Sequence, residues 1–185
     1  MKFHQLKNEV CREVKESLER VEEKEVQLLL ESILSAQKVF VVGAGRVMLI
    51  MRSFAKRMKH LGMDVYVVGE TVEPPIGAED LLLAGSASGE TMITVTVARI
   101  ARSRRARIGL ITSSTQSKLR QLANICVRIP CPTKLHLSDE PRSFQPMGNL
   151  FEQSLLIFGD CLAMLLQERL GVTEEQMWKA HANLE

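Results

Sequence analysis

Five short apolar runs alternate with stretches of helical periodicity through the middle of this chain of 185 residues. We predict a strand in each run, at residues 39–42, 65–68, 81–83, 108–111 and 125–127. Continuous apolar strands that alternate with helices are typical of parallel sheets covered on both faces. The alternation therefore predicts a doubly wound α/β fold, in which a five-stranded parallel sheet lies between two layers of helices. Ligands of such folds bind beyond the carboxyl ends of the strands.

The helices that flank the sheet are predicted from the spacing of apolar residues. Residues 1–35 are predicted as one amphipathic helix, because apolar residues recur there every three or four positions. Further helices are expected at residues 46–61, 90–104, 116–123, 147–170 and 173–180. Since no linker interrupts the pattern, we expect a single domain with an αβ core at about 38–130 and C-terminal helices at about 147–182.

The composition is that of a globular cytoplasmic protein. Hydrophobic residues make up 45% of the chain, charged residues 25%, and the net charge of +2 gives no basis for binding nucleic acid. No apolar run approaches the roughly 20 residues that cross a membrane, and no signal-peptide core is present. The cysteines lack zinc-ligand spacing, and we interpret Cys126 and Cys131 as free buried thiols. We expect no cofactor. Arginines at 99–107 are interpreted as a solvated helix end.

A loop of small hydroxyl residues follows the third predicted strand and opens directly into a helix. Ser86, Ser88 and Thr91 place hydroxyl groups in this serine loop, residues 86–91, and Gly89 lets the backbone approach a ligand closely. Hydroxyl and backbone N–H donors at the positive end of a helix suit a phosphate dianion. The same pattern also fits an ordinary turn in which a serine caps the helix.

Polar residues also follow the other predicted strands. The first strand ends at Gly43-Ala44-Gly45-Arg46 and the second at Gly69-Glu70-Thr71, while the fourth runs into a loop with Ser113 and Ser117. A dinucleotide site would need a third glycine where Met48 stands. Two hydroxyl-rich loops at one sheet edge therefore favour a small phosphorylated ligand over a dinucleotide.

Glu152 is the only acidic residue between Glu140 and Asp160, and it lies among apolar residues at the start of a long predicted helix. A carboxylate in partly apolar surroundings suits proton transfer near neutral pH. An exposed glutamate that complements the helix dipole is the alternative interpretation.

With these loops in view, the chain resembles the sugar isomerase (SIS) domains, and specifically the 6-phospho-3-hexuloisomerases of the ribulose monophosphate pathway. The resemblance covers nearly the whole chain, and its marks are Gly43–Arg46, His60–Gly62, Val68–Thr71, Ser86–Thr91, Pro146–Glu152 and His181–Glu185. Many SIS domains share the serine loop, whereas the stretches 146–152 and 181–185 are more specific to hexuloisomerases. Two positions depart from the family pattern: Val47-Met48 replaces Ser-Gly, and Ala87 replaces a glycine.

The resemblance implies a single SIS domain that interconverts 3-hexulose 6-phosphate and fructose 6-phosphate through a 2,3-enediolate, without a metal. It implies that Glu152 transfers the proton and that His181, from the same or a neighbouring subunit, assists ring opening. It further implies a homotetramer, with a homodimer as the alternative. Expected substrate contacts come from Gly45, Arg46, Ser86, Ser88, Gly89, Glu90, Thr91, Ser113 and Ser117.

Other functions occur on this fold. A heptose-phosphate isomerase would be expected to carry paired metal-ligating histidines, whereas the four histidines here are scattered, and His60 and His136 receive no role. A non-catalytic SIS sensor would not need Glu152 or His181, but such sensors usually carry a DNA-binding domain as well. An isomerase is therefore the favoured interpretation, and an isomerase of another sugar phosphate stays open because Val47-Met48 alters the first loop.

Overall fold

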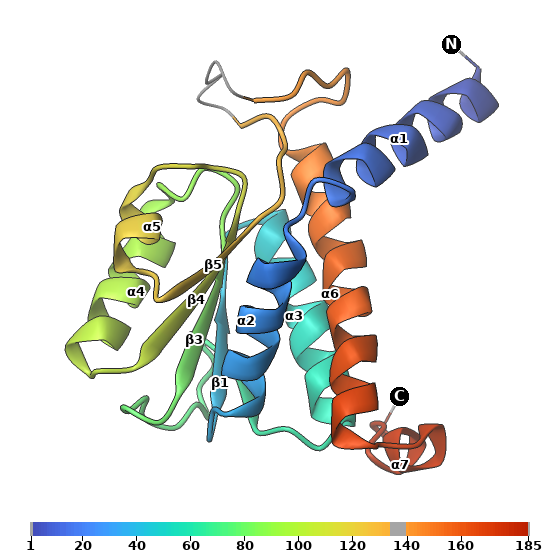
Figure 1. Ribbon diagram of the computed structural model, residues 1–185. Coiled ribbons are helices and arrows are strands. Elements are labelled where there is room, and N and C mark those ends of the chain that lie inside the picture. The colour runs from blue at the N-terminus through green and yellow to red at the C-terminus, as the bar shows by residue number, and fades with distance from the viewer. Residues whose placement is uncertain (1, 134–139, 185) are drawn as a thin grey trace.

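The protein, described by a computed structural model at residues 2–133 and 140–184, has three layers (Figure 1). The middle layer is a parallel five-stranded sheet in the order β2-β1-β3-β4-β5. Its strands are β1 (Val39–Val42), β2 (Val65–Val67), β3 (Leu81–Gly85), β4 (Arg107–Thr112) and β5 (Ile125–Arg128). The predicted doubly wound α/β fold is confirmed, and the predicted strands differ from the observed ones only at their ends.

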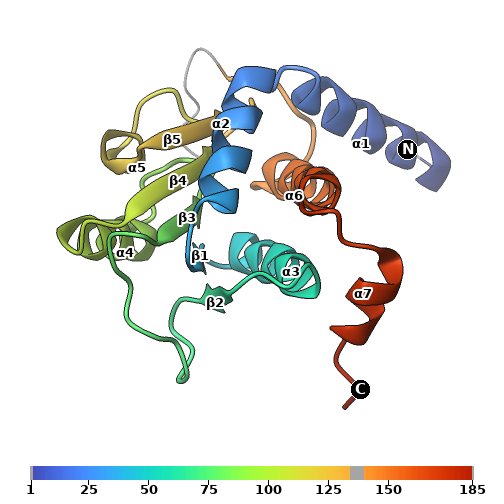
Figure 2. The same ribbon diagram turned by 60° about the horizontal axis from the view of Figure 1, so that its bottom comes forward.

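Helices cover both faces of the sheet (Figure 2). One face carries α2 (Glu23–Leu34), α3 (Arg46–His60) and α6 (Asn149–Leu170), and the other carries α4 (Met92–Ser103) and α5 (Lys118–Leu122). Successive strand side chains point to opposite faces, so each strand supplies two apolar cores. In β1, for example, Val39 and Val41 face the α3 and α6 side, whereas Phe40 and Val42 face the α4 side.

The amino-terminal region corrects the prediction of one helix over residues 1–35. It forms two helices, α1 (Phe3–Leu18) and α2, which are separated by residues 19–22. The two helices take different directions because α1 packs against α6 while α2 packs against β5 as well as α6 (Figure 1). Both helices have the same apolar periodicity, and so the sequence pattern carries no mark of the change in direction.

Helix α6 corrects the expectation that no segment is apolar enough to cross a membrane. It has 22 residues, and an 18-residue window within it has a mean hydropathy of 1.3, which suffices for a span by length and composition. However, 44% of that window is buried inside the domain, where Leu155 and Leu162 belong to the core beside α3. We therefore interpret α6 as the core helix of a soluble domain.

Several local predictions are confirmed. Gly171, directly after α6, and Gly62, which follows the C-cap Leu61 of α3, have φ values of 64° and 80°, and the left-handed backbone ends each helix there. Helix α7 (Glu174–Lys179) begins with a capping box at Thr173. Cys126 and Cys131 are buried free thiols, and burial raises the pKa of each.

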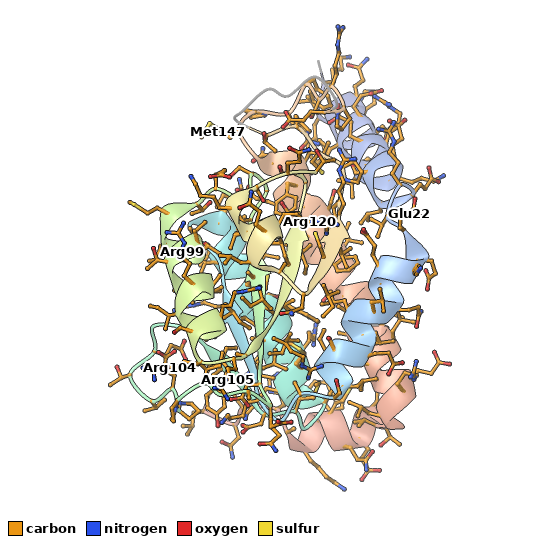
Figure 3. All side chains as sticks on the ribbon, turned by 60° about the vertical axis from the view of Figure 1, so that its left-hand side comes forward. Glu22, Arg99, Arg104, Arg105, Arg120 and Met147 are labelled. Atoms are coloured by element: carbon orange, nitrogen blue, oxygen red, sulfur yellow. The ribbon has the colours of Figure 1, made fainter. Side chains whose placement is uncertain are left out.

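The arginines at the carboxyl end of α4 lie away from the carboxyl edge of the sheet, where ligands of such folds bind. Arg104 and Arg105 are at the carboxyl end of α4, and Figure 3 shows them at the opposite end of the molecule from Met147. Arg102 Nη1 donates to the carbonyl of Leu122 at 2.7 Å, which joins α4 to the end of α5. The interpretation of these arginines as a helix end is therefore consistent with their position.

Candidate functional site

A cavity of about 510 Å³ lies beyond the carboxyl ends of β1 and β3. These two strands lie side by side, but β1 leads through α3 to β2 on one side, whereas β3 leads through α4 to β4 on the other. Ligands of doubly wound sheets bind where the strand order reverses in this way. The residues that line the cavity come from four segments, 44–47, 85–91, 132–133 and 147–152.

The serine loop forms one wall of the cavity and is held by its own hydroxyl groups. The buried Ser86 hydroxyl accepts the Gly89 N–H at 3.1 Å and lies 3.1 Å from the Thr91 hydroxyl. The Ser88 hydroxyl accepts the Glu90 N–H at 3.2 Å, so its own proton can be donated to a ligand. Thr91 is the N-cap residue of α4, but its side chain accepts no hydrogen bond from the first turn of that helix. The first turn of α4 therefore has N–H groups with which it can bind an anion.

Gly89 and Glu90 connect the serine loop to the next loop of the sheet edge. Gly89 has φ +66°, and a Cβ there would come within 2.1 Å of Ser117 Oγ, so only glycine fits. Glu90 Oε1 accepts the backbone N–H of Lys118 and Oε2 pairs with its ammonium group, each at 2.8 Å. These hydrogen bonds from Lys118 lower the pKa of Glu90. Glu90 thus presents a fixed anion that ties the loop to α5.

The structure does not bring Ser113 and Ser117 to the cavity wall. Ser113 is buried and donates its hydroxyl proton to the carbonyl of Ile129 at 2.9 Å. The Ser117 hydroxyl accepts the Arg120 N–H at 3.1 Å and so caps α5. Because neither residue lines the cavity, we do not include them in the site proposed below.

Arg46 and Glu152 form an ion pair across the first turns of α3 and α6. Arg46 Nε lies 3.1 Å from Glu152 Oε2, and its Nη1 donates to Asn149 Oδ1 at 2.8 Å. The Glu152 side chain is only 15% exposed, whereas that of Arg46 is 62% exposed. The carboxylate is therefore held in the cavity wall by a guanidinium that solvent or a ligand can reach. Gly45 starts α3 with φ +57° and so turns the chain toward this pair.

The segment that precedes Glu152 is unusual in its backbone. Met147 has φ +60°, a strained value for a residue with a side chain, and the residue is 73% exposed at the cavity. At the next residue, Gly148, a Cβ would lie 3.7 Å from Glu152 Oε1. The lack of a side chain at Gly148 leaves the approach to the carboxylate open.

The two departures from the family pattern have different consequences. Val47 lines the cavity, and its Cγ1 fills the space above Gly43 and Gly85, at 3.2 and 3.1 Å from where a Cβ would stand on each. The cavity therefore has an apolar wall where the resemblance predicts a hydroxyl. Ala87 does not have a positive φ, so alanine is accommodated in the serine loop without strain.

His181 lies far from this cavity within its own chain. Its ring stacks on His60 with centroids 5.1 Å apart and lies 5.4 Å from the ring of Trp178. This cluster is beside α7, at the opposite end of α6 from Glu152 (Figure 1). An α-helix rises about 1.5 Å per residue, so the length of α6 separates the two by roughly 30 Å. His181 therefore does not reach Glu152 of its own chain. His136 falls outside the described residues.

Two polar residues outside the predicted set lie at the cavity or beside it. Asn149 orients Arg46, and Thr133 lines the wall, where its N–H donates to Glu140 Oε2 at 2.9 Å. Thr133 lies in the segment that follows β5, at the same edge of the sheet as the serine loop, so the rule for strand ends applies to it as well. Asn149 lies within the stretch 146–152, but its partner Arg46 is 103 residues away, and spacing alone gives no indication of that contact.

The chain matches the SIS domain family over residues 32–138. It is 36% identical over 185 residues to 3-hexulose-6-phosphate isomerase of Bacillus subtilis, with 100% of both chains covered. It is 38% identical over 174 residues to the protein of that name from Mycobacterium gastri, covering 94% of this chain and 86% of that one. A crystal structure of a Methanococcus jannaschii protein, from which a 3-hexulose-6-phosphate isomerase function was inferred, superimposes with a TM-score of 0.84 and 29% identity, covering 98% of this chain and 99% of that one.

Proposed function

The chain belongs to the SIS domain family, among its 3-hexulose-6-phosphate isomerases, and we propose that the cavity between the serine loop and Glu152 is its active site. The reaction interconverts 3-hexulose 6-phosphate and fructose 6-phosphate, a step of the ribulose monophosphate pathway. One observation carries the assignment of the site: the phosphate-binding loop and a largely buried carboxylate line the same cavity.

Glu152 is the proton-transfer base in this proposal. It removes the proton from C2 of the 3-keto sugar, the electrons of that C–H bond form the 2,3-enediolate, and the proton returns to C3 to give fructose 6-phosphate. One carboxylate can perform both transfers because C2 and C3 are adjacent and the intermediate stays bound. Arg46, beside the carboxylate, binds the oxygens of the enediolate and offsets their negative charge.

Ser86, Ser88, Gly89 and Thr91 hold the phosphate of the substrate at the start of α4 in this proposal. The helix terminus supplies backbone N–H groups, and the Ser88 hydroxyl supplies a proton that the loop itself does not use. Gly45 and Glu90 fix the two loops on either side. This grip holds the sugar in register with Glu152, where a small displacement greatly reduces the rate.

Exchange of carbon-bound hydrogen tests the proposed reaction directly. Fructose 6-phosphate incubated with the purified protein in deuterated water is expected to gain deuterium at C3, because the enediolate returns a solvent-derived proton to that carbon. Proton NMR of the recovered sugar phosphate measures the position. Exchange at C1 alone would instead identify an aldose–ketose isomerase, and binding without any exchange would identify a sugar-phosphate sensor.

Ser88→Ala tests the phosphate grip. We expect KM for fructose 6-phosphate to rise about 10- to 100-fold, because one hydrogen bond to a charged group contributes about 1.5–3 kcal/mol and about 1.4 kcal/mol is a factor of ten. Inorganic phosphate should also protect the variant against heat less than it protects the original protein, since a ligand stabilises only the state that binds it. Thermal scans with and without phosphate measure this, and Ser103→Ala, a change at the far end of α4, is the control. If KM and the protection by phosphate against heat were both unchanged, the loop would be only a structural turn that caps the helix.

The proposal also includes assembly as a cytoplasmic homotetramer, with a homodimer as the smaller alternative. Phe3 on α1 and Met164 on α6 are exposed by 81% and 69%. An apolar groove between α1 and α6, lined by Val10, Val14 and Ile157, adds to this surface. Extended apolar surfaces of this kind mark subunit contacts. In such an assembly His181 of one chain assists ring opening in the cavity of its neighbour.

A further inference from the structure

We propose that Glu13, on α1, is a positioning residue that holds the wall of the active site next to Glu152, an inference that rests on the function proposed above. Glu13 itself does not line the cavity. It lies on α1, whose outer surface is largely exposed and which projects away from the sheet (Figure 1). Glu13 is nevertheless only 7% exposed, so its carboxyl group is buried at the contact between α1 and the rest of the domain.

The Glu13 carboxylate receives three hydrogen bonds from one short segment. Ser143 Oγ donates to Oε2 at 2.6 Å, Gln145 Nε2 donates to the same oxygen at 3.0 Å, and the Phe144 N–H donates to Oε1 at 3.2 Å. These donors are about 130 residues from Glu13 in the chain, so the contact is tertiary. A buried carboxylate is retained only where several donors satisfy it, and here all three come from residues 143–145.

Residues 143–145 lead directly into the strained part of the cavity wall. Pro146 follows them, and then Met147 with φ +60° and Gly148 beside the Glu152 carboxylate. A strained backbone persists only where its surroundings hold it in place. Glu13 supplies that restraint on the amino-terminal side, while α6 supplies it on the carboxyl-terminal side.

A second contact of α1 supports the other end of the same wall. One turn after Glu13, the buried Ser17 accepts a hydrogen bond from Cys131 Sγ at 3.6 Å. Cys131 immediately precedes Pro132 and Thr133, which line the cavity. Helix α1 therefore holds both outer segments of the cavity from behind, through one carboxylate and one hydroxyl.

Glu13→Gln tests this role because it keeps the shape of the side chain. The amide retains one oxygen but presents an NH₂ group toward donors, and so it loses bonds to residues 143–145. We expect kcat to fall about 10- to 100-fold, the scale for a small displacement of reacting groups, with KM changed less than threefold because the serine loop is untouched. Glu16→Gln, on the same helix with an exposed carboxylate, is the matched control and should retain both parameters.

Exchange of the two partners separates positioning from stability. In the double variant Glu13→Gln with Gln145→Glu, the amide at 13 can donate to the carboxylate at 145, and kcat should return to within about threefold of the original. A thermal scan accompanies every variant, and all rates are measured well below the transition. If Glu13→Gln lowers only the transition temperature and retains kcat, or if the exchange restores stability without kcat, Glu13 has a purely structural role. Activity of the unaltered protein in the same assay keeps this outcome distinct from failure of the proposed function.

Discussion

Replacing Glu152 with glutamine is expected to reduce turnover by at least about two orders of magnitude while leaving the fold intact. General-base catalysis contributes about 10²- to 10⁴-fold, and an amide cannot accept a proton from carbon. Glutamine keeps the size of the side chain and an oxygen that can face Arg46, so the wall of the cavity should retain its shape. Because the phosphate loop is untouched, fructose 6-phosphate should still bind. The loss should therefore fall on kcat rather than on KM.

Three measurements make this expectation specific. Steady-state rates give kcat and KM, calorimetry gives the affinity for fructose 6-phosphate, and NMR in deuterated water gives exchange at C3. Glu168→Gln is the control, because Glu168 is an exposed carboxylate near the other end of the same helix. If the Glu152 variant kept both turnover and exchange, the carboxylate would serve only to complement the start of α6.

The sheet and its functional edge could be predicted because both depend on local pattern. The runs at Val39–Val42 and Leu81–Gly85 are apolar throughout and end in loops of small residues, so their burial and the position of the loops follow from sequence. Parallel strands then bring those loops to one edge, which is how Ser88 and Gly45 come to line a single cavity. The family resemblance added the choice of Glu152 over other acidic residues.

The side-chain contacts within the site could not be predicted, because they depend on which groups the fold places next to each side chain. Ser113 and Ser117 have side chains that suit a ligand site, yet the first donates to a backbone carbonyl, the second caps α5, and neither lines the cavity. The contact of Glu13 with residues 143–145 joins two segments that carry no recognisable motif for each other. Periodicity indicates which side of a helix is buried, but it does not indicate which element covers that side.

His181 is expected to act on the cavity of a neighbouring subunit, and mixed oligomers test this. His181→Ala should lose at least about tenfold in turnover of fructose 6-phosphate, since general acid–base assistance typically contributes more than that. The loss should be smaller for a substrate analogue that cannot close a ring, because His181 serves ring opening. Within one chain, α6 separates His181 from Glu152. Each shared site would therefore take Glu152 from one chain and His181 from its neighbour, and each variant removes only one of these two residues.

Co-expression of Glu152→Gln and His181→Ala chains should therefore restore activity. If chains mix at random, about one site in four combines an intact Glu152 with an intact His181 from the neighbour, and about a quarter of the original activity should return. Sedimentation first establishes that the chains assemble as a tetramer or dimer. The control mixes Glu152→Gln chains with chains that carry both substitutions, and it should restore nothing, because every site then lacks Glu152. A purely monomeric protein, or a mixture without restored activity, would remove His181 from the site, since its own cavity lies at the other end of the molecule.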